Sequence, residues 1–239
     1  MSSDLSQVKA LTFDVFGTVV DWRSSVIKEL SEFGKAKGVS ADWDLFADKW
    51  RGGYAPSMDQ VRKGELPWTN IDVLHRMVLD RLLDEFDITN LNEEEKVYLN
   101  KAWHRLDPWP DSVEGLTKLK EKYIIATLSN GNISLLANMA KHSGLPWDVI
   151  LSSELAKHYK TDKEVYLKAL SLLDLEPHEL MMCAAHQNDL LSARSLGLKT
   201  AYINRPLESG PDKKNDATDD MPFDIIAADI IDLAKQLVV

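Results

Sequence analysis

The chain has 239 residues, 44% of them hydrophobic, and a formal net charge of −10 at pH 7. This length and composition suffice for a buried core, and we expect one α/β domain that carries a second, smaller one. The acidic balance argues against a nucleic-acid partner, since phosphate binding requires a basic surface. The sequence contains no apolar run of about 18 residues, so we expect no membrane span.

The cellular compartment is indicated by the N-terminus and by cysteine usage. Residues 1–7 are polar and lack the basic and then apolar pattern of a signal peptide. The single cysteine, Cys183, cannot form an internal disulfide, and its apolar flanks favour an inert buried thiol. Both observations fit the reducing cytoplasm, which is the localisation that we expect.

The first predicted element is a short buried strand over residues 8–13, which ends at Asp14 and a Gly17-Thr18 turn. From about residue 24 to residue 105 the apolar residues recur with helical spacing. The predicted helices span 26–37, 43–63, 71–86 and 93–105, and Gly52, Gly53, Pro56 and Pro67 interrupt the second of them. No convincing strand falls in this region.

After Pro108-Trp109-Pro110 the pattern alternates between strands and helices. Strands are predicted at 123–128, 149–152, 180–185, 199–203 and 225–226, and helices at 133–143, 163–173, 190–196 and 230–237. Such alternation predicts an α/β fold with a doubly wound parallel sheet. The first strand must belong to that sheet. Residues 1–21 and 108–239 are therefore expected to form the core, with 22–107 inserted as a helical cap and 206–222 as a polar loop near the surface.

Ligands of a doubly wound sheet bind outside the carboxyl ends of its strands, so the residues after each strand are the candidates for chemistry. They are Asp14-Val15-Phe16-Gly17-Thr18, Ser129-Asn130-Gly131, Lys160 and His186-Gln187-Asn188-Asp189. Each residue alone is explained as a helix cap or a solvated side chain. Two carboxylates, a hydroxyl–amide pair and a lysine that converge on one crevice are better explained as an active site.

These four groups resemble the four motifs of the haloacid dehalogenase superfamily, and the similarity extends over nearly the whole chain. The matching residues are Asp14-x-Phe16-Gly17-Thr18, Ser129-Asn130-Gly131, Lys160 and Asp189. The resemblance implies a Rossmann-like core, an inserted helical cap and a nucleophilic role for Asp14.

The position two residues after Asp14 separates the reactions of this superfamily. Its phosphatases place a second aspartate there as the general acid, whereas this chain has Phe16. Halide is a weak base that leaves without a proton, so an apolar residue suits dehalogenation. The last motif supplies one acid, Asp189, which together with Asp14 is a poor oxygen cage for magnesium. We therefore expect neither a metal ion nor another cofactor.

Two further positions resemble type II 2-haloacid dehalogenases. Arg51 stands where those enzymes have a cap arginine, and Tyr166 follows Lys160 by six residues, as it does in them. The resemblance implies a small anionic haloacid as the substrate. Relatives often form homodimers, so a homodimer is an expected assembly.

The resemblance also implies a covalent mechanism. Asp14, oriented by Thr18 and Lys160, displaces halide in line at C2 of the substrate and forms an ester. Water then attacks the ester carbonyl, and Asp189 and His186 assist proton removal.

The remaining site residues are assigned to binding. Ser129 and Asn130, with backbone N–H groups at the start of the following helix, are expected to hold the substrate carboxylate. Arg51 is expected to receive the developing halide charge, and Val15 and Phe16 to line the substrate site.

The chain also departs from the best-known dehalogenases. Those enzymes have serine and asparagine where this chain has Ala184 and His186, tyrosine where it has Phe16, and usually proline at Thr161. The segments 184–190 and 142–148 look more like the subgroup that includes haloacetate and fluoroacetate dehalogenases. A small substrate is therefore expected.

The remaining aromatic residues have structural interpretations. Five of the seven tryptophans lie in the predicted cap and are interpreted as cap core, with a wall of the halide pocket as the alternative for one or two of them: Trp22, Trp43, Trp50, Trp68 and Trp103. The other histidines show no metal-ligand spacing and are interpreted as structural or surface residues: His75, His104, His142, His158 and His178. In the predicted loop, the pair Lys213-Lys214 is interpreted as solvated.

Two other functions stay open at this point. One is a magnesium-dependent phosphatase or phosphonatase of the same superfamily, since phosphonatases also lack the second aspartate and use a cap lysine. This chain has cap lysines at positions 28, 35, 37, 49 and 63. The other is a regulatory binding module without activity, which would be expected to have lost Asp14 or Lys160, and both are present.

Overall fold

The structure is a computed structural model that describes residues 4–211 and 222–238. In these residues six parallel strands form one sheet in the order β3-β2-β1-β4-β5-β6. The strands are β1 (Ala10–Phe13), β2 (Ile124–Ser129), β3 (Val149–Ser152), β4 (Leu180–Ala184), β5 (Lys199–Ile203) and β6 (Ile225–Ala227). This is the predicted doubly wound α/β sheet. Residues 212–221 of the predicted polar loop, with Lys213 and Lys214, lie outside the described residues.

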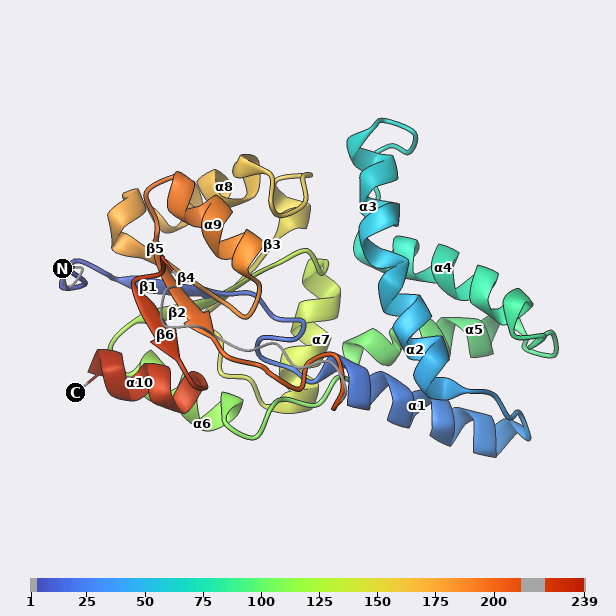
Figure 1. The fold of residues 1–239 in the computed structure, drawn as a ribbon. Helices are drawn as coiled ribbons and strands as arrows, with labels where there is room; N and C mark the ends of the chain where they lie inside the picture. Colours follow the sequence, from blue (N-terminus) through green and yellow to red (C-terminus); the bar gives the residue numbers. More distant parts are fainter. Residues whose placement is uncertain (1–3, 212–221, 239) are drawn as a thin grey trace.

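The two faces of the central strand β1 pack against two different helix layers (Figure 1). Leu11 and Phe13 belong to the core on one face, with side chains of α6 (Ser112–Lys120), α7 (Ile133–Ser143) and α10 (Ile230–Val238). Ala10 belongs to the core on the other face, with side chains of α8 (Lys163–Leu173) and α9 (Gln187–Ser195). Burial on both faces explains why the sequence of β1 is almost wholly apolar.

A group of helices lies to one side of the sheet core in Figure 1. It consists of α1 (Trp22–Lys37), α2 (Trp43–Gly52), α3 (Tyr54–Arg62), α4 (Ile71–Glu85), α5 (Glu93–Asn100) and the short 3₁₀ helix η1 (Lys101–His104). Side-chain caps start four of these helices: Asp21, Asp42, Asn70 and Asn92 each accept a hydrogen bond from a backbone N–H of the first turn. The chain enters and leaves this group at neighbouring points, since Val20 and Pro108 form a β-bridge.

The predicted helix bounds were only partly right. The predicted stretch 43–63 is interrupted as expected, since it divides into α2 and α3 at Gly53, where an added Cβ would lie 2.6 Å from Val78 Cγ1 of α4. Helix α6 was not predicted, and α9 begins at Gln187 instead of at residue 190. None of the described helices is long and apolar enough to cross a membrane.

Candidate active site

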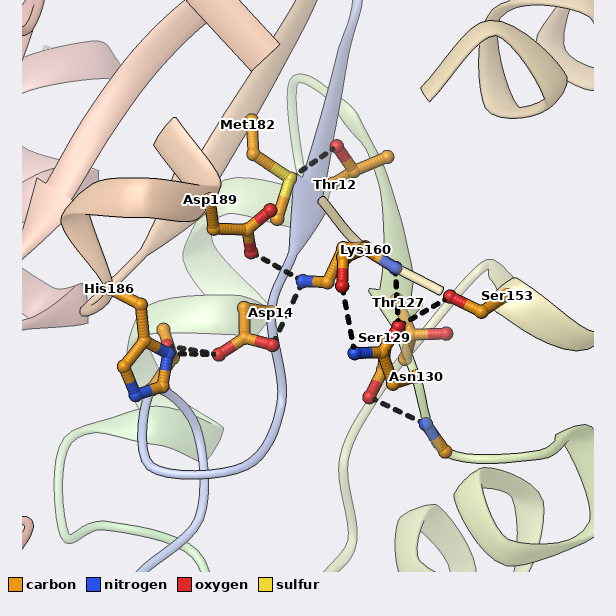
Figure 2. A network of polar contacts seen from close by, with 12 residues as sticks. Thr12, Asp14, Thr127, Ser129, Asn130, Ser153, Lys160, Met182, His186 and Asp189 are labelled. Atoms are coloured by element: carbon orange, nitrogen blue, oxygen red, sulfur yellow. Dashed lines mark hydrogen bonds and ion pairs between the residues drawn. The ribbon is translucent and has the colours of Figure 1, made fainter. Parts of the chain in front are cut away.

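The carboxyl edge of the sheet brings five of the predicted site residues into one hydrogen-bonded cluster (Figure 2). Asp14 follows β1, Thr18 lies in the next turn, and His186 follows β4. Lys160 comes from the segment between β3 and α8, and Asp189 from the first turn of α9. Adjacent parallel strands end at the same edge, which is why residues so far apart in sequence converge here.

Both oxygens of the Asp14 carboxylate accept hydrogen bonds. Lys160 Nζ donates to Oδ1 at 2.9 Å, and Oδ2 accepts from Thr18 Oγ1 at 3.0 Å and from His186 Nδ1 at 2.9 Å. Thr18 is itself oriented, because its hydroxyl oxygen accepts from the backbone N–H of Ala185 at 2.9 Å. Burial alone would raise the pKa of Asp14, but the Lys160 charge and the bond from His186 hold it well below its usual range. Asp14 is therefore a fixed carboxylate anion.

Lys160 lies between two carboxylates. Its ammonium also donates to Asp189 Oδ2, while Tyr166 donates its hydroxyl hydrogen to Asp189 Oδ1 at 2.5 Å. Burial would lower the pKa of Lys160, but the charges of Asp14 and Asp189 outweigh it and raise that pKa. Burial raises the pKa of Asp189, and the charge of Asp14 acts in the same direction. Both oxygens of Asp189 are thus occupied by donors within the protein.

Asn130 holds the loop that carries Lys160. The side-chain oxygen of Asn130 accepts from the backbone N–H of Lys160 and from Ser153 Oγ, both at 2.7 Å. Ser129 is completely buried, and its hydroxyl oxygen accepts from Gly131 N at 3.2 Å. These contacts give Asn130 a positioning role for Lys160, whereas the Ser129 hydroxyl bonds within its own turn, to Gly131. The predicted contact with a substrate carboxylate stays a prediction.

The predicted cap cation, Arg51, lies among aromatic rings. Its guanidinium carbon is 4.4 Å from the ring centroid of Tyr54 and 5.7 Å from that of Trp22. Tyr54 was not singled out in the sequence, yet its hydroxyl bonds to the Asn130 side chain and lies in the field of Asp14 and Lys160. The sequence feature that could have identified Tyr54 is its position one helical turn after Arg51, on the adjoining helix.

The apolar residues beside Asp14 are buried. Val15 is 1% exposed and Phe16 is 4% exposed, and the Phe16 ring meets the edge of Trp103 with centroids 6.0 Å apart. Trp103 belongs to η1, so Phe16 connects the turn after β1 to the helical group.

His186 lies between two acids, one of which the sequence analysis missed. Its Nδ1–H donates to Asp14, and its Nε2–H donates to Glu208 Oε1 at 3.0 Å. Burial would lower the pKa of His186, but the bonds to Asp14 and Glu208 outweigh it and raise that pKa to about 10. At neutral pH His186 is therefore an imidazolium that donates from both ring nitrogens.

The interpretation of residues 206–222 as a surface loop was wrong at Glu208, which is 5% exposed. Glu208 follows β5, so the rule that directs attention to the carboxyl ends of strands would have found it. Cys183 is a buried free thiol, as predicted, and burial raises its pKa.

The residues around Asp14 do not fit a magnesium ion. Magnesium favours a near-octahedral shell of oxygen ligands, but here the Lys160 ammonium bonds to both Asp14 and Asp189. The described residues include no group of three or more histidine, cysteine, aspartate or glutamate side chains that could hold a metal. Phe16 also stands where a further carboxylate would be needed.

The parallel sheet, with a carboxylate–lysine cluster at its carboxyl edge beside a group of helices, defines an α/β protein with a buried nucleophilic carboxylate as its candidate site. Residues 8–197 match the family of haloacid dehalogenase-like hydrolases, and the chain belongs to that family. The sequence is 31% identical to (S)-2-haloacid dehalogenase 4A of Burkholderia cepacia over 84% of this chain and 85% of that protein.

Two solved structures are similar over nearly the full length. The defluorinating L-2-haloacid dehalogenase Rha0230 is 46% identical, with a TM-score of 0.93 and coverage of 97% of this chain and 96% of its own. The L-2-haloacid dehalogenase PA0810 is 47% identical, with a TM-score of 0.93 and coverage of 97% and 99%. The family and the fold expected from the sequence motifs are thereby confirmed.

Proposed function

We propose that this chain hydrolyses short 2-haloacids, haloacetates in particular, to 2-hydroxy acids and halide. The observation that carries the proposal is the Asp14 carboxylate, which is ionised and fixed by donors on both oxygens. A carboxylate held this way is oriented for in-line attack on a carbon that bears a leaving group. The Arg51 guanidinium supplies a cation for the anionic substrate or for the halide.

The two oxygens of Asp14 have different environments, and we assign them different roles. Oδ1 accepts one hydrogen bond, from Lys160, and forms the new bond to C2 as the carbon–halogen electron pair leaves with the halide. Oδ2 accepts from Thr18 and His186 and becomes the carbonyl oxygen of the ester. Negative charge develops on that oxygen when water attacks, so the hydroxyl of Thr18 stabilises the transition state of the second step.

The choice of leaving group follows from Phe16. A phosphate ester needs an acid to protonate its alcohol, and Phe16 cannot supply a proton. Halide leaves without one. The lack of fit to magnesium around Asp14 and Asp189 argues in the same direction.

Two unpaired donors in the cap favour a substrate with a small halogen. His75 and Trp103 are buried and stack with centroids 4.4 Å apart, and neither the His75 ring nitrogens nor Trp103 Nε1 has a hydrogen-bond partner among the described residues. Tyr54 connects this pair to Arg51, because its ring centroid is 5.9 Å from that of His75 and 4.4 Å from the Arg51 guanidinium carbon. Fluoride is small and strongly hydrated, so its departure requires several donors in a water-poor pocket. We therefore include fluoroacetate among the substrates, an expectation that the similarity to Rha0230 supports.

The test measures halide released from chloroacetate, fluoroacetate and both enantiomers of 2-chloropropionate, with and without a chelator. We expect release from the haloacetates, preference for one enantiomer, and no effect of the chelator. Phosphate release from a phosphomonoester with strict dependence on magnesium would instead support the phosphatase. Chloride release without detectable fluoride would remove fluoroacetate from the proposal and leave a 2-haloacid dehalogenase.

A further inference from the structure

Hydrogen bonds connect the helical group to the nucleophile Asp14 through the side chains of Glu208 and His186. Trp22 Nε1 of α1 donates to Glu208 Oε1 at 3.3 Å. His186 Nε2 donates to the same oxygen at 3.0 Å, and His186 Nδ1 donates to Asp14 Oδ2 at 2.9 Å. The side chain of Glu208 is 7% exposed, whereas that of His186 is 36% exposed. His186 thus bonds to the buried carboxylate of Glu208 and is itself accessible to solvent.

The loop that carries Glu208 is anchored by a buried arginine. Arg205 donates through both terminal nitrogens to the two oxygens of Asp111 at 2.7 Å, and through Nε to the backbone carbonyl of Thr18 at 2.8 Å. This loop is therefore held against the turn that follows β1. Bidentate arginine–carboxylate bonds of this kind fix orientation as well as distance.

Gly17 allows the Glu208 carboxylate to approach that turn. Gly17 has a φ of +83°, and a Cβ added there would lie 2.1 Å from Glu208 Oε1. A side chain at position 17 would displace the carboxylate, so the turn and the loop are built to fit each other. This fit sets the position of Glu208 against His186.

We propose that Glu208 is a positioning residue that enables His186 to serve as the base in ester hydrolysis. The inference rests on the proposed function, because it concerns the second step of that reaction. By accepting the Nε2–H bond, Glu208 fixes the ring so that Nδ1 faces Asp14 in both protonation states.

Formation of the ester changes the charge around His186. Asp14 loses its negative charge when Oδ1 is alkylated, so Glu208 is then the one anion bonded to the imidazolium. His186 releases its Nδ1 proton to solvent, and the neutral ring keeps its proton on Nε2, toward Glu208. The fall in the pKa of His186 from its value of about 10 in the resting enzyme has this physical cause.

The proton and electron balance of the second step is then complete. Neutral Nδ1 takes a proton from the water that attacks Asp14 Cγ, and the charge of the tetrahedral intermediate develops on Oδ2. The intermediate breaks the Cγ–Oδ1 bond, and the departing alkoxide takes that proton from His186. The second hydrogen of the water remains on Asp14 and passes to His186, which restores the carboxylate and the imidazolium.

The surroundings of Asp189 explain why His186 is the better base. Asp189 accepts from Lys160 and from Tyr166, one bond on each oxygen. Lys160 remains paired with Asp189 after Asp14 has been alkylated. A proton transfer to Asp189 would have to disrupt that ion pair, whereas one to Nδ1 of His186 disrupts none.

The test is the Glu208→Gln variant of the full chain with chloroacetate, followed by rapid quench and intact-mass measurement. We expect a chloride burst at nearly the wild-type rate, ester accumulation on Asp14, and hydrolysis of the ester slowed about 10²-fold or more. The pH profile of ester hydrolysis should move to lower pH, since the anion that raises the pKa of His186 is gone. The matched control is Glu29→Gln, which removes a carboxylate paired with Arg105 in the helical group and should leave both steps unchanged.

The outcomes separate this proposal from the proposed function. If wild type releases no halide from any haloacid, the proposed function fails. If wild type does so, but Glu208→Gln shows no ester accumulation and an unchanged pH profile, the role of Glu208 is refuted. A lower melting temperature with both steps slowed equally would mean that Glu208 is structural only.

A second measurement does not depend on the folding of that variant. Asp14→Asn mimics the ester, because its side chain is neutral and keeps a carbonyl oxygen. NMR titration of the His186 ring should show a lower pKa in Asp14→Asn than in wild type. An equal pKa in the two proteins would overturn the proposed change in the role of His186.

Discussion

At the scale of single residues, the contacts that keep Asp14 ionised also determine what each of its oxygens can do. Lys160 bonds to one oxygen, and Thr18 and His186 bond to the other. The sequence indicated these four residues because each follows or adjoins a strand end. It did not indicate Glu208, since the approach of its carboxylate depends on a loop whose path is set by Arg205 and Gly17.

Replacement of Asp14 by asparagine should abolish turnover and leave the fold intact, because an amide cannot form the ester. We expect kcat to fall by at least about 10⁴-fold, as for other catalytic nucleophiles. A single turnover of wild type in heavy-oxygen water should place the label on Asp14, where the water attacks. Direct appearance of the label in the product of the first turnover would contradict the covalent mechanism.

Replacement of Arg51 by alanine should remove the cation that we propose to stabilise the departing halide, and we expect kcat to fall about 10²-fold or more. Steady-state kinetics with chloroacetate measure the effect. Lys63→Ala is the matched control, since Lys63 is an exposed cation of the same helical group. Unchanged kcat and KM in Arg51→Ala would mean that the similarity of Arg51 to the cap arginine of dehalogenases is accidental.

At the scale of elements, the sequence predicted well those segments whose periodicity is decided locally. Helices α7 and α8 and strands β3 and β5 have the predicted bounds, because each has a continuous apolar pattern between clear turn residues. Helix α6 was not predicted, because its helical pattern is short. The division between α2 and α3 falls at Gly53, one of the residues predicted to interrupt this stretch, although its close approach to Val78 was not predictable.

The bond between Asp111 and Arg205 connects the start of α6 to the loop after β5, and both residues are less than a tenth exposed. Asp111→Asn leaves the buried guanidinium without its counter-charge, so we expect the free energy of unfolding to fall by roughly 3–5 kcal/mol. Denaturant titration measures this change. In the control Glu93→Gln, an exposed partner of Arg76 is removed, and the loss should be under about 1 kcal/mol. Similar losses in the two variants would argue against an anchoring role for Asp111.

His75 of α4 is expected to lower the stability of the fold and, in the proposed function, to contact the halide. Its two ring nitrogens are buried without hydrogen bonds to the described residues. His75→Phe keeps the stacking on Trp103 and removes the unpaired groups, so we expect stability to rise by about 1–2 kcal/mol. We expect fluoride release to fall more than chloride release in the same variant. Higher stability with unchanged release of both halides would make His75 part of the cap core alone.

At the scale of the whole molecule, the site is assembled where the helical group meets the sheet core. Arg62 donates to the backbone carbonyl of Lys160 at 2.7 Å, and Tyr159 donates to the backbone carbonyl of Thr69. Trp22 reaches Glu208 from the same side. The rule that ligands bind at the carboxyl ends of strands predicts the site residues that come from the sheet core. It cannot predict those that come from the helical group, because contacts between the two depend on their tertiary arrangement.

Two histidines with opposite shifts of pKa shape how the stability of the molecule depends on pH. Burial lowers the pKa of His75 to about 3, whereas the bonds to Asp14 and Glu208 overcome burial and raise the pKa of His186 to about 10. An unfolded histidine has a pKa of about 6.5. Below that pH the unfolded chain binds a proton at His75 that the folded chain excludes, so His75 makes stability fall as the pH drops from about 6.5 toward 3.

His186 affects the stability of the fold at alkaline pH. Between about pH 6.5 and pH 10 the folded chain holds a proton at His186 that the unfolded chain has released. Its contribution to stability is therefore complete below pH 6.5 and is lost as the pH rises through 10.

We expect chemical denaturation of wild type to give a lower free energy of unfolding at pH 9 than at pH 7, and His186→Gln to reduce that difference. The control is His178→Gln, which removes an exposed histidine and should keep the wild-type difference. If His186→Gln loses as much stability between pH 7 and pH 9 as wild type does, His186 is not the imidazolium that its contacts with Asp14 and Glu208 indicate.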